Sequence, residues 1–338
     1  MTPKQSSPSR WPPAVHLIVR VIRNLFQALI GSYALSLTVF LVLRAISGDA
    51  LSLVAIFNTY LHLLLILSPL ALIPALILRN RLLLVLLALP ILTFVIDYGG
   101  QFMPRSAVHA ADQTELRLLT YNLLRSNLNT DATTAIIRES GADVVALQEL
   151  TPLQAEAFNA SLRDLYPYLA FHPQEDFSGQ GVLSRYPIRS DEFWQIHLGH
   201  QRIELEIEGQ WIALYNAHPI HPFIGGFPNF YQPGDRANEI EVLLSRTAAE
   251  SIPVLLVGDF NLSDQESLYQ QISARFSDAY RQIGWGMGFT YPNMGILLAR
   301  IDYVFHSADF TPLEARALPD GGGSDHLPLW VRLGLNGS

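Results

Sequence analysis

Three long apolar runs, separated by short polar breaks, dominate the N-terminal part of the chain. Residues 25–43 and 50–78 contain no Asp, Glu, Lys or Arg, and the third run, residues 82–103, contains one carboxylate. The hydrocarbon core of a bilayer is about 30 Å thick, which a helix of about 20 apolar residues crosses. The sequence therefore predicts an N-terminal membrane region, residues 1–103, with about three transmembrane helices. A buried helical subdomain is the alternative.

Basic residues around these runs predict their orientation, because cytoplasmic flanks of membrane spans are enriched in Lys and Arg. Six of them precede the first run or separate the second from the third: Lys4, Arg10, Arg20, Arg23, Arg79 and Arg81. Only Arg44 and Arg105 flank the opposite ends. The N-terminus is thus predicted in the cytoplasm, and three spans place the C-terminal domain outside it. A re-entrant third run would instead leave that domain inside.

Charge divides the chain at the same place. Residues 1–111 carry eight basic and two acidic side chains, a net +6, and subtracting this from the whole-chain −8 leaves −14 on residues 112–338. A strongly acidic domain disfavours a nucleic-acid backbone, which usually recruits clustered Lys and Arg. The chain has no cysteine, which excludes disulfides, thiolate metal sites and a cysteine nucleophile.

A predicted linker, residues 104–114, leads to a soluble domain, residues 115–338, in which short apolar strands alternate with amphipathic helices. Strands are predicted at residues 116–121, 144–147, 181–184, 203–207, 211–216, 254–257, 301–305 and 329–333. Helices are predicted at residues 131–139 and 236–250, and a further helix begins at Thr151, a capping residue followed by proline. Several strands adjoin without a helix between them, so an α/β domain with mixed sheets is expected.

Polar residues recur where these apolar strands end or begin, and ligand sites of layered α/β folds gather at such places. They are Asn122, Gln148, Glu149, Asn216, His218, Asp259, Asn261, Asp302, Asp325 and His326. Carboxylates and carboxamides are hard oxygen ligands that suit Mg²⁺ or Mn²⁺. Each residue alone has an ordinary structural explanation, such as a turn or a strand terminus. Their order and spacing together indicate a metal-assisted site.

The ordered set resembles the endonuclease/exonuclease/phosphatase superfamily. The matching segments are LLTYN (118–122), VVALQE (144–149), GVLSRYPI (181–188), NAH (216–218), VGDFN (257–261), RIDYVF (300–305) and GSDHLP (323–328). GDFN with a downstream SDH is the specific part. With its apolar N-terminal region, the chain looks most similar to bacterial membrane-anchored members. The resemblance implies a four-layer α/β sandwich, two mixed sheets flanked by helices, and a place in the bacterial inner membrane.

The resemblance also implies a role for each residue. Glu149 is expected to be the main metal ligand, with Asn122 beside it and Asp325 opposite. Asp259 is expected to activate the attacking water, and Asn261 to hold a phosphate oxygen. His326 is expected to act on the phosphate, with Asp302 fixing its imidazole and raising its pKa. His218 matches a second catalytic histidine, whose own histidine partner the sequence does not identify, and Asn122, Asn216 and Asn261 are expected to contact substrate.

These observations predict a membrane-anchored, Mg²⁺- or Mn²⁺-dependent phosphoesterase that attacks phosphorus with water. A lipid or small phosphoester is favoured over nucleic acid. An extracytoplasmic nuclease is the second hypothesis, and a patch of Arg163, Arg185, Arg202, Arg236 and Arg300 around the cleft would support it. A non-catalytic, membrane-tethered binding module is the third. Two aromatic, glycine-rich segments, residues 223–232 and 285–292, could contact a membrane surface or line the cleft, or simply pack as loops.

Overall fold

The computed structural model describes residues 12–105, 113–223, 231–293 and 296–336. The chain forms two compact units that do not coincide with a simple division of the sequence. One contains residues 1–48 and 61–99, and the other contains residues 49–60 and 100–338. We describe the two units separately.

The first unit is helical. Its elements are α1 (Pro13–Ser47), α3 (Leu61–Leu65), α4 (Leu67–Ile77) and α5 (Arg81–Tyr98). Asn80 caps α5 by accepting hydrogen bonds from the backbone N–H groups of Leu82 and Leu83. A small buried core joins α1, α4 and α5, and the leucines and valines on the other faces of these helices are exposed.

Contacts within this unit fix the direction of each helix. Ile30 and Ala34 of α1 share the core with Leu83 and Leu87 of α5. The C-terminal ends of the same helices are joined by the ion pair of Arg44 and Asp97, at 3.6 Å, so α1 and α5 run in the same direction. Near the other end of α1, Ile22 lies beside Ile77, whereas Tyr33 hydrogen-bonds Ser68 at 2.8 Å. The helix α4 therefore runs in the opposite direction.

Two helices, Pro13–Ser47 and Arg81–Phe102, are long and apolar enough to cross a membrane. The second apolar run is broken between α2 (Ser52–Thr59) and residues 61–77 by a bend of 72°, and it gives a third span only if the bent pair counts as one. The irregularity therefore lies in the second run, not in the third, where the sequence analysis placed the risk of a re-entrant segment.

The second unit contains two six-stranded mixed sheets. The first has the order β13-β14-β1-β2-β4-β3 and the second the order β5-β6-β7-β8-β12-β9. Each sheet has one parallel pair, β1 with β2 and β7 with β8, and the other pairs are antiparallel. The strands of the first sheet are β13 (Phe310–Ala317), β14 (Leu329–Leu335), β1 (Thr114–Asn122), β2 (Val144–Gln148), β4 (Gln180–Ser184) and β3 (Tyr168–His172). Those of the second are β5 (Ile188–Gln195), β6 (Gly199–Ile207), β7 (Gln210–Ala217), β8 (Val254–Asp259), β12 (Asp302–His306) and β9 (Ser277–Asp278).

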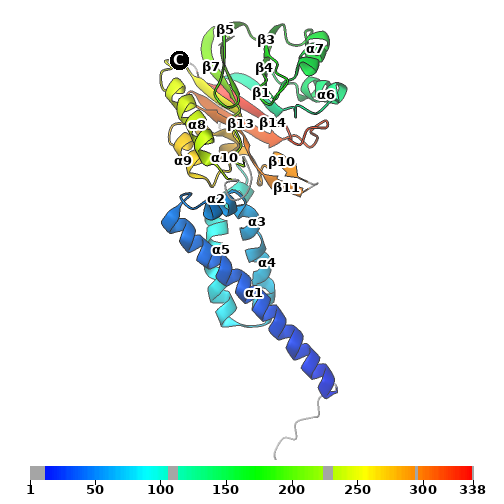
Figure 1. The fold of residues 1–338 in the computed structure, drawn as a ribbon, viewed down its shortest axis with the longest axis vertical. Coiled ribbons are helices and arrows are strands. Elements are labelled where there is room, and N and C mark those ends of the chain that lie inside the picture. Colours follow the sequence, from blue (N-terminus) through cyan, green and yellow to red (C-terminus); the bar gives the residue numbers. More distant parts are fainter. Residues whose placement is uncertain (1–11, 106–112, 224–230, 294–295, 337–338) are drawn as a thin grey trace, which may run out of the picture. The chain divides into compact units, whose positions relative to one another are not determined.

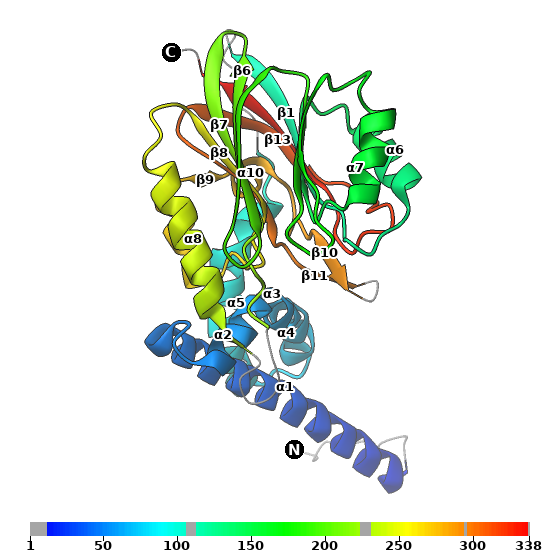
Figure 2. The ribbon, with the colours of Figure 1, turned by 45° about the horizontal axis from the view of Figure 1, so that its top comes forward.

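Helices cover the outer face of each sheet, as Figures 1 and 2 show. The first sheet is covered by α6 (Thr130–Ser140) and α7 (Pro152–Ser161), and the second by α8 (Pro233–Thr247) and α9 (Ser267–Ser273). Smaller elements are η1 (Gly99–Phe102), α10 (Ala279–Ile283) and the hairpin of β10 (Tyr291–Asn293) and β11 (Ile296–Ala299). This is the predicted four-layer sandwich of two mixed sheets between helices.

Both faces of the central strands are buried, which explains their nearly continuous apolar sequences. In β8, Leu255 and Val257 face the core between the sheets, whereas Val254 and Leu256 face the helical layer of α8 and α9. Strand β1 alternates in the same way between the inner core and the layer of α6 and α7. Because these strands are buried on both sides, polar side chains gather at their ends.

Candidate active site

The two parallel strand pairs and β12 bring the predicted polar residues together. Asn122 ends β1, and Glu149 follows β2, the strand beside it. In the second sheet, His218 follows β7 and Asp259 ends β8, its neighbour. Asp302 begins β12 directly opposite Asp259 in the antiparallel register. Residues separated by up to 180 positions in the sequence thus meet at one edge of the sandwich because the strands that carry them end there.

The backbone conformation at position 258 explains why the residue directly before Asp259 is glycine. Gly258 has φ of +133°, and a Cβ atom at this position would lie 1.9 Å from the carbonyl oxygen of Ala217 on β7. Only glycine permits this close approach of β8 to β7. Glu149 and Asn261 also have positive φ, at 57° and 52°. Strained conformations of this kind in residues other than glycine are concentrated at functional sites.

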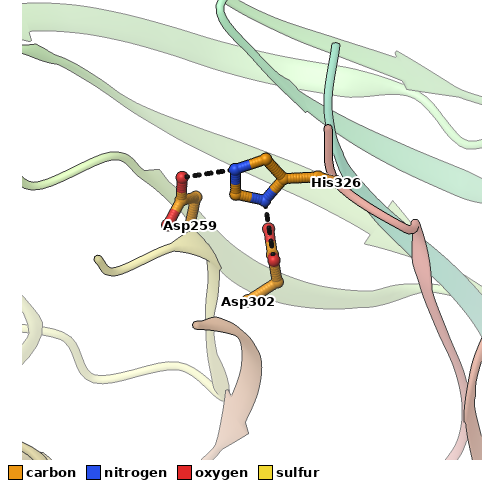
Figure 3. Close-up of side chains that lie close together, drawn as sticks. All are labelled: Asp259, Asp302 and His326. Atoms are coloured by element: carbon orange, nitrogen blue, oxygen red, sulfur yellow. Dashed lines mark hydrogen bonds and ion pairs between the residues drawn. The ribbon is translucent and has the colours of Figure 1, made fainter. Parts of the chain in front are cut away.

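Asp259, Asp302 and His326 form the centre of the site (Figure 3). The Nδ1 atom of His326 lies 3.0 Å from Oδ2 of Asp302, and Nε2 lies 3.6 Å from Oδ2 of Asp259. All three side chains are buried. Burial alone would lower the pKa of His326, but the carboxylates of Asp302, Asp259 and Asp325 outweigh it and raise the pKa to about 10. The imidazole is therefore held as a cation at neutral pH.

A second carboxylate, Glu149, faces the same cleft. Its Oε1 accepts a hydrogen bond from Asn122 at 3.1 Å, and its Oε2 accepts one from the backbone N–H of Arg125 at 2.9 Å. Asn122 also donates to Oδ2 of Asp259 at 3.0 Å, so one carboxamide connects the two carboxylates. Burial raises the pKa of Asp325, and Glu149 and Asp259 raise it further, although His326 opposes them.

This donor set fits a divalent cation. Among the described residues, no Lys or Arg is ion-paired with Glu149, Asp259 or Asp325, so three carboxylates share the cleft with only histidine as a cationic partner. The ligand atoms of Asp259, Asp302 and His326 also lie within 4.8 Å of one another. Those atoms already face one another in ion pairs, whereas Glu149 and Asp325 line the cleft outside this cluster. Of the three predicted metal ligands, Glu149 and Asp325 line the cleft, whereas Oδ1 of Asn122 accepts a hydrogen bond from the backbone N–H of Leu124 at 3.0 Å.

His218 and Asn261 border the same cleft. The Nε2 of His218 lies 3.5 Å from Oδ2 of Asp259, and its Nδ1 lies 3.2 Å from the carbonyl oxygen of Phe177. Its backbone N–H donates to Nδ1 of His200, a buried histidine that the sequence analysis did not identify as its neighbour. The side-chain amide of Asn261 donates one of its two N–H groups to the carbonyl oxygen of Pro219 at 3.0 Å, and the other N–H group is the one that could donate to a phosphate oxygen.

Asn216 occupies a different position. Its side chain is fully buried, and it is not among the described residues that line the cleft. Its amide donates to the carbonyl oxygens of Leu147 and Gly181, and its oxygen accepts a hydrogen bond from Gln148 at 2.7 Å. These bonds join the two sheets directly behind the site. The structure therefore does not show the substrate contact expected for Asn216, because the observed hydrogen bonds of its side chain all go to other protein groups.

The cleft has a volume of about 530 Å³, a size usual for small-molecule sites. It also includes residues outside the set of predicted catalytic and metal-binding residues. Tyr291 packs against His326 with ring centroids 4.9 Å apart, and Leu124, Phe177 and Phe223 line the walls. Tyr291 lies within the segment 285–292, whose proposed place in the cleft is thus supported for this residue. Of the segment 223–232, residues 224–230 lie outside the described residues.

Comparisons with known proteins agree with this fold. The sequence model of the Endonuclease/Exonuclease/phosphatase family matches residues 119–326, more than half of the chain, whereas the comparison with curated proteins finds no match. Solved structures with a similar fold include an endonuclease/exonuclease/phosphatase from Bacteroides vulgatus, with a TM-score of 0.55 and 17% identity over 66% of this chain and 100% of that chain. A second, from Beutenbergia cavernae DSM 12333, has a TM-score of 0.54 and 21% identity over 66% of this chain and 72% of that chain.

A third similar structure is D. rerio TDP2 humanized by 14 mutations, with a TM-score of 0.54 and 17% identity over 65% of this chain and 98% of that chain. At these identities the structures show a shared fold. The family match covers the segments that carry Asn122, Glu149, Asp259, Asp302 and His326. The chain therefore belongs to the endonuclease/exonuclease/phosphatase family of hydrolases.

Proposed function

We propose that the protein is a divalent-metal-dependent phosphoesterase in which water attacks phosphorus in line with the leaving oxygen. The observation that carries this proposal is the arrangement of Asp259, His326 and Asp302 opposite Glu149 and Asn122 in one cleft. The family supplies the reaction class, phosphoester hydrolysis. The metal, the roles of individual residues and the substrate are our inference.

Each residue of the cleft has a task in this mechanism. Asp259 orients the water and accepts its proton, because its carboxylate lies at the centre of the site. His326 is held as a cation by Asp302 and donates a hydrogen bond to a phosphate oxygen as negative charge accumulates there. Asn261 and His218 bind the remaining phosphate oxygens. Positioning and charge neutralisation supply most of the rate in phosphoryl transfer.

Glu149, Asn122 and Asp325 would hold the metal, which we propose to be Mg²⁺ or Mn²⁺. When bound, it would neutralise the charge of the phosphoester as a Lewis acid. The three carboxylates of the cleft repel one another without a cation, and this repulsion is the structural reason for expecting one.

A lipid or small phosphoester fits the cleft better than nucleic acid. The cleft lining contains no Lys or Arg among the described residues. Four of the arginines that could have formed a basic patch are paired with acids: Arg185 with Asp143, Arg202 with Glu250, Arg236 with Glu266 and Arg300 with Asp278. Arg163 hydrogen-bonds Asn159 near the end of α7. They form no basic patch along the described cleft lining, although one structural relative, D. rerio TDP2, is complexed with a single-strand DNA product.

The proposal is tested with the purified full-length chain on bis-p-nitrophenyl phosphate, p-nitrophenyl phosphate, plasmid DNA and RNA, each with Mg²⁺, Mn²⁺ or EDTA. We expect metal-dependent turnover of a small diester, and its loss by more than a hundredfold in Asp259→Ala and His326→Ala. Asp164→Asn is the matched control, because Asp164 is exposed and lies on α7's side of the unit, in an ion pair with Arg138. Faster turnover of DNA would support the nuclease hypothesis, and metal binding without any turnover would support a binding module.

A further inference from the structure

The segment Asp49–Tyr60 joins α1 to α3 in the sequence but belongs to the α/β unit. Its helix α2 has an unusual distribution of side chains. Asn58 and Thr59 are buried beside Val54 and Ala55, with 3% and 9% of their surface exposed, whereas Leu53 and Phe57 are 68% and 49% exposed. The buried polar side chains require hydrogen-bond partners, and the exposed apolar face is suited to an apolar environment.

Three hydrogen bonds attach this segment to the loop before α9. Asn58 donates to the carbonyl oxygen of Gln265 at 2.6 Å, and the backbone N–H of Ser267 donates to Asp49 at 2.6 Å. The hydroxyl of Thr59 donates to the carboxylate of Glu266 at 3.3 Å. These bonds use side chains within an otherwise apolar run, so they explain why the run 50–78 bends instead of continuing as one helix.

The same loop supports the active site. Glu266 is ion-paired with Arg236, a fully buried arginine that also donates to the carbonyl oxygen of Asn261. A chain of contacts therefore leads from Thr59 through Glu266 and Arg236 to Asn261. Asn261 is the residue that we assign to phosphate binding. Beyond this attachment, Thr59 and Tyr60 themselves line the catalytic cleft, together with Tyr291 and His326.

We propose that Asp49–Tyr60 forms a wall of the active-site cleft, that Tyr60 contacts substrate, and that the substrate is an amphiphile whose phosphoester lies at a membrane surface. This inference rests on the function proposed above. The segment continues at both ends into apolar helices, and its exposed face consists of Leu51, Leu53 and Phe57. That face lies in the membrane surface, and the cleft beside it receives a headgroup, while apolar side chains such as Phe177 and Phe223 contact the adjoining chain.

The substrate class is tested with two diesters that share one chromogenic leaving group, methyl p-nitrophenyl phosphate and dodecyl p-nitrophenyl phosphate, the second carried in phosphatidylcholine vesicles. With the full-length protein reconstituted in those vesicles, we expect kcat/KM at least tenfold higher for the dodecyl ester. Tyr60→Ala should lower it about tenfold for the dodecyl ester and less than threefold for the methyl ester. Tyr60→Phe, which keeps the aromatic ring, should retain most of the wild-type kcat/KM for the dodecyl ester. Tyr168→Ala, at an exposed tyrosine of β3, is the matched control.

Asp259→Ala separates failure of this inference from failure of the proposed function. Turnover that depends on Asp259 but shows neither the chain-length preference nor an effect of Tyr60→Ala would overturn the inference and leave the proposed function intact. Cleavage of an oligonucleotide faster than the dodecyl ester, at the same rate by the wild type and by Tyr60→Ala, would also overturn the inference and leave the proposed function intact. Turnover that survives Asp259→Ala, or no turnover of either ester, would overturn the proposed function, on which the inference rests.

A separate measurement tests the wall without relying on turnover. The chain contains no cysteine, so Asn58→Cys with Gln265→Cys gives a single possible intramolecular cross-link. We expect rapid cross-linking of the pair by a short bis-maleimide and none in either single variant. A double variant that folds but does not cross-link would show that the segment is not attached to the loop and would overturn the proposal.

Discussion

At the scale of single residues, the chemistry centres on His326 and the carboxylates around it. The sequence indicated that Asp302 and His326 act together, because both lie in motifs of a recognisable order. It could not show that Asp259 lies 3.6 Å from the other nitrogen of the same imidazole, since that distance depends on how β8 and β12 pair. Nor could it show that Asn216 is fully engaged behind the site, because Asn in a strand end gives no sign of its partners.

The contact between Asp302 and His326 leads to the first prediction. Asp302→Asn keeps the shape of the side chain but removes the charge that holds the imidazole as a cation, so the pKa of His326 should fall from about 10. We expect kcat to fall about a hundredfold with KM within threefold of wild type, measured on bis-p-nitrophenyl phosphate. An unchanged kcat would show that His326 does not need this partner.

At the scale of elements, sequence reasoning succeeded for the interior strands and failed at the edges. The strands that it missed in the two sheets are β13, β3, β5 and β9, and each is an edge strand. Edge strands have one neighbour and need no continuous apolar run. Strand β5 (IRSDEFWQ) is largely polar, and β13 contains Pro312 beside a register shift. Interior strands such as β8 are buried on both faces and, except for the start of β6 at Gly199, were predicted to within two residues at their ends.

The close approach of β7 and β8 leads to the second prediction. Gly258→Ala would place a Cβ atom 1.9 Å from the carbonyl oxygen of Ala217, at a φ that alanine rarely adopts. We expect a loss of about 2–4 kcal/mol in unfolding free energy and a strong loss of turnover, because Asp259 is the next residue. Gly234→Ala is the control, since that Cβ would meet no atom within 4 Å. Equal stability of the two variants, measured by chemical denaturation, would argue against this pairing of strands.

A third prediction concerns the ion pair between Glu250, which follows α8, and Arg202 of β6. Hydrogen bonds from Arg202 lower the pKa of Glu250 below its usual 4.5. A lowered pKa in the folded state stabilises the fold above pH 4.5, and this contribution is lost as the pH falls through the folded-state value. Glu250→Gln should therefore cost about 1–2 kcal/mol at pH 7, with the difference from wild type shrinking below pH 4.5. A difference that is constant from pH 7 to pH 3 would contradict this assignment.

At the scale of the whole molecule, the directions of the helices bear on the membrane topology predicted from the sequence. The C-terminal ends of α1 and α5 lie together, and α4 runs in the opposite direction to α1. Because α2 belongs to the α/β unit, only residues 61–77 of the second apolar run lie in the helical unit. The sequence could predict apolar runs from hydropathy, but not that α2 would leave the second run, because that depends on hydrogen bonds to a loop more than 200 residues away.

The side of the membrane on which the reaction occurs is a prediction from the sequence. With the N-terminus in the cytoplasm, the three predicted crossings would place residue 338 outside it. Alkaline phosphatase fused after Ser338 should therefore be active in a bacterial host, and β-galactosidase at the same position should not. The opposite pattern would indicate an even number of crossings and a cytoplasmic catalytic unit.

The central claim, that the cleft directs water to attack phosphorus with the help of a divalent cation, is tested most directly by isotope labelling. The full-length protein is incubated with bis-p-nitrophenyl phosphate and Mg²⁺ or Mn²⁺ in water enriched in ¹⁸O, and both products are analysed by mass spectrometry. We predict one ¹⁸O atom in each p-nitrophenyl phosphate released, none in the p-nitrophenol, and no product with EDTA or with Asp259→Ala. Label in the p-nitrophenol, or equal product formation in EDTA, would contradict the mechanism.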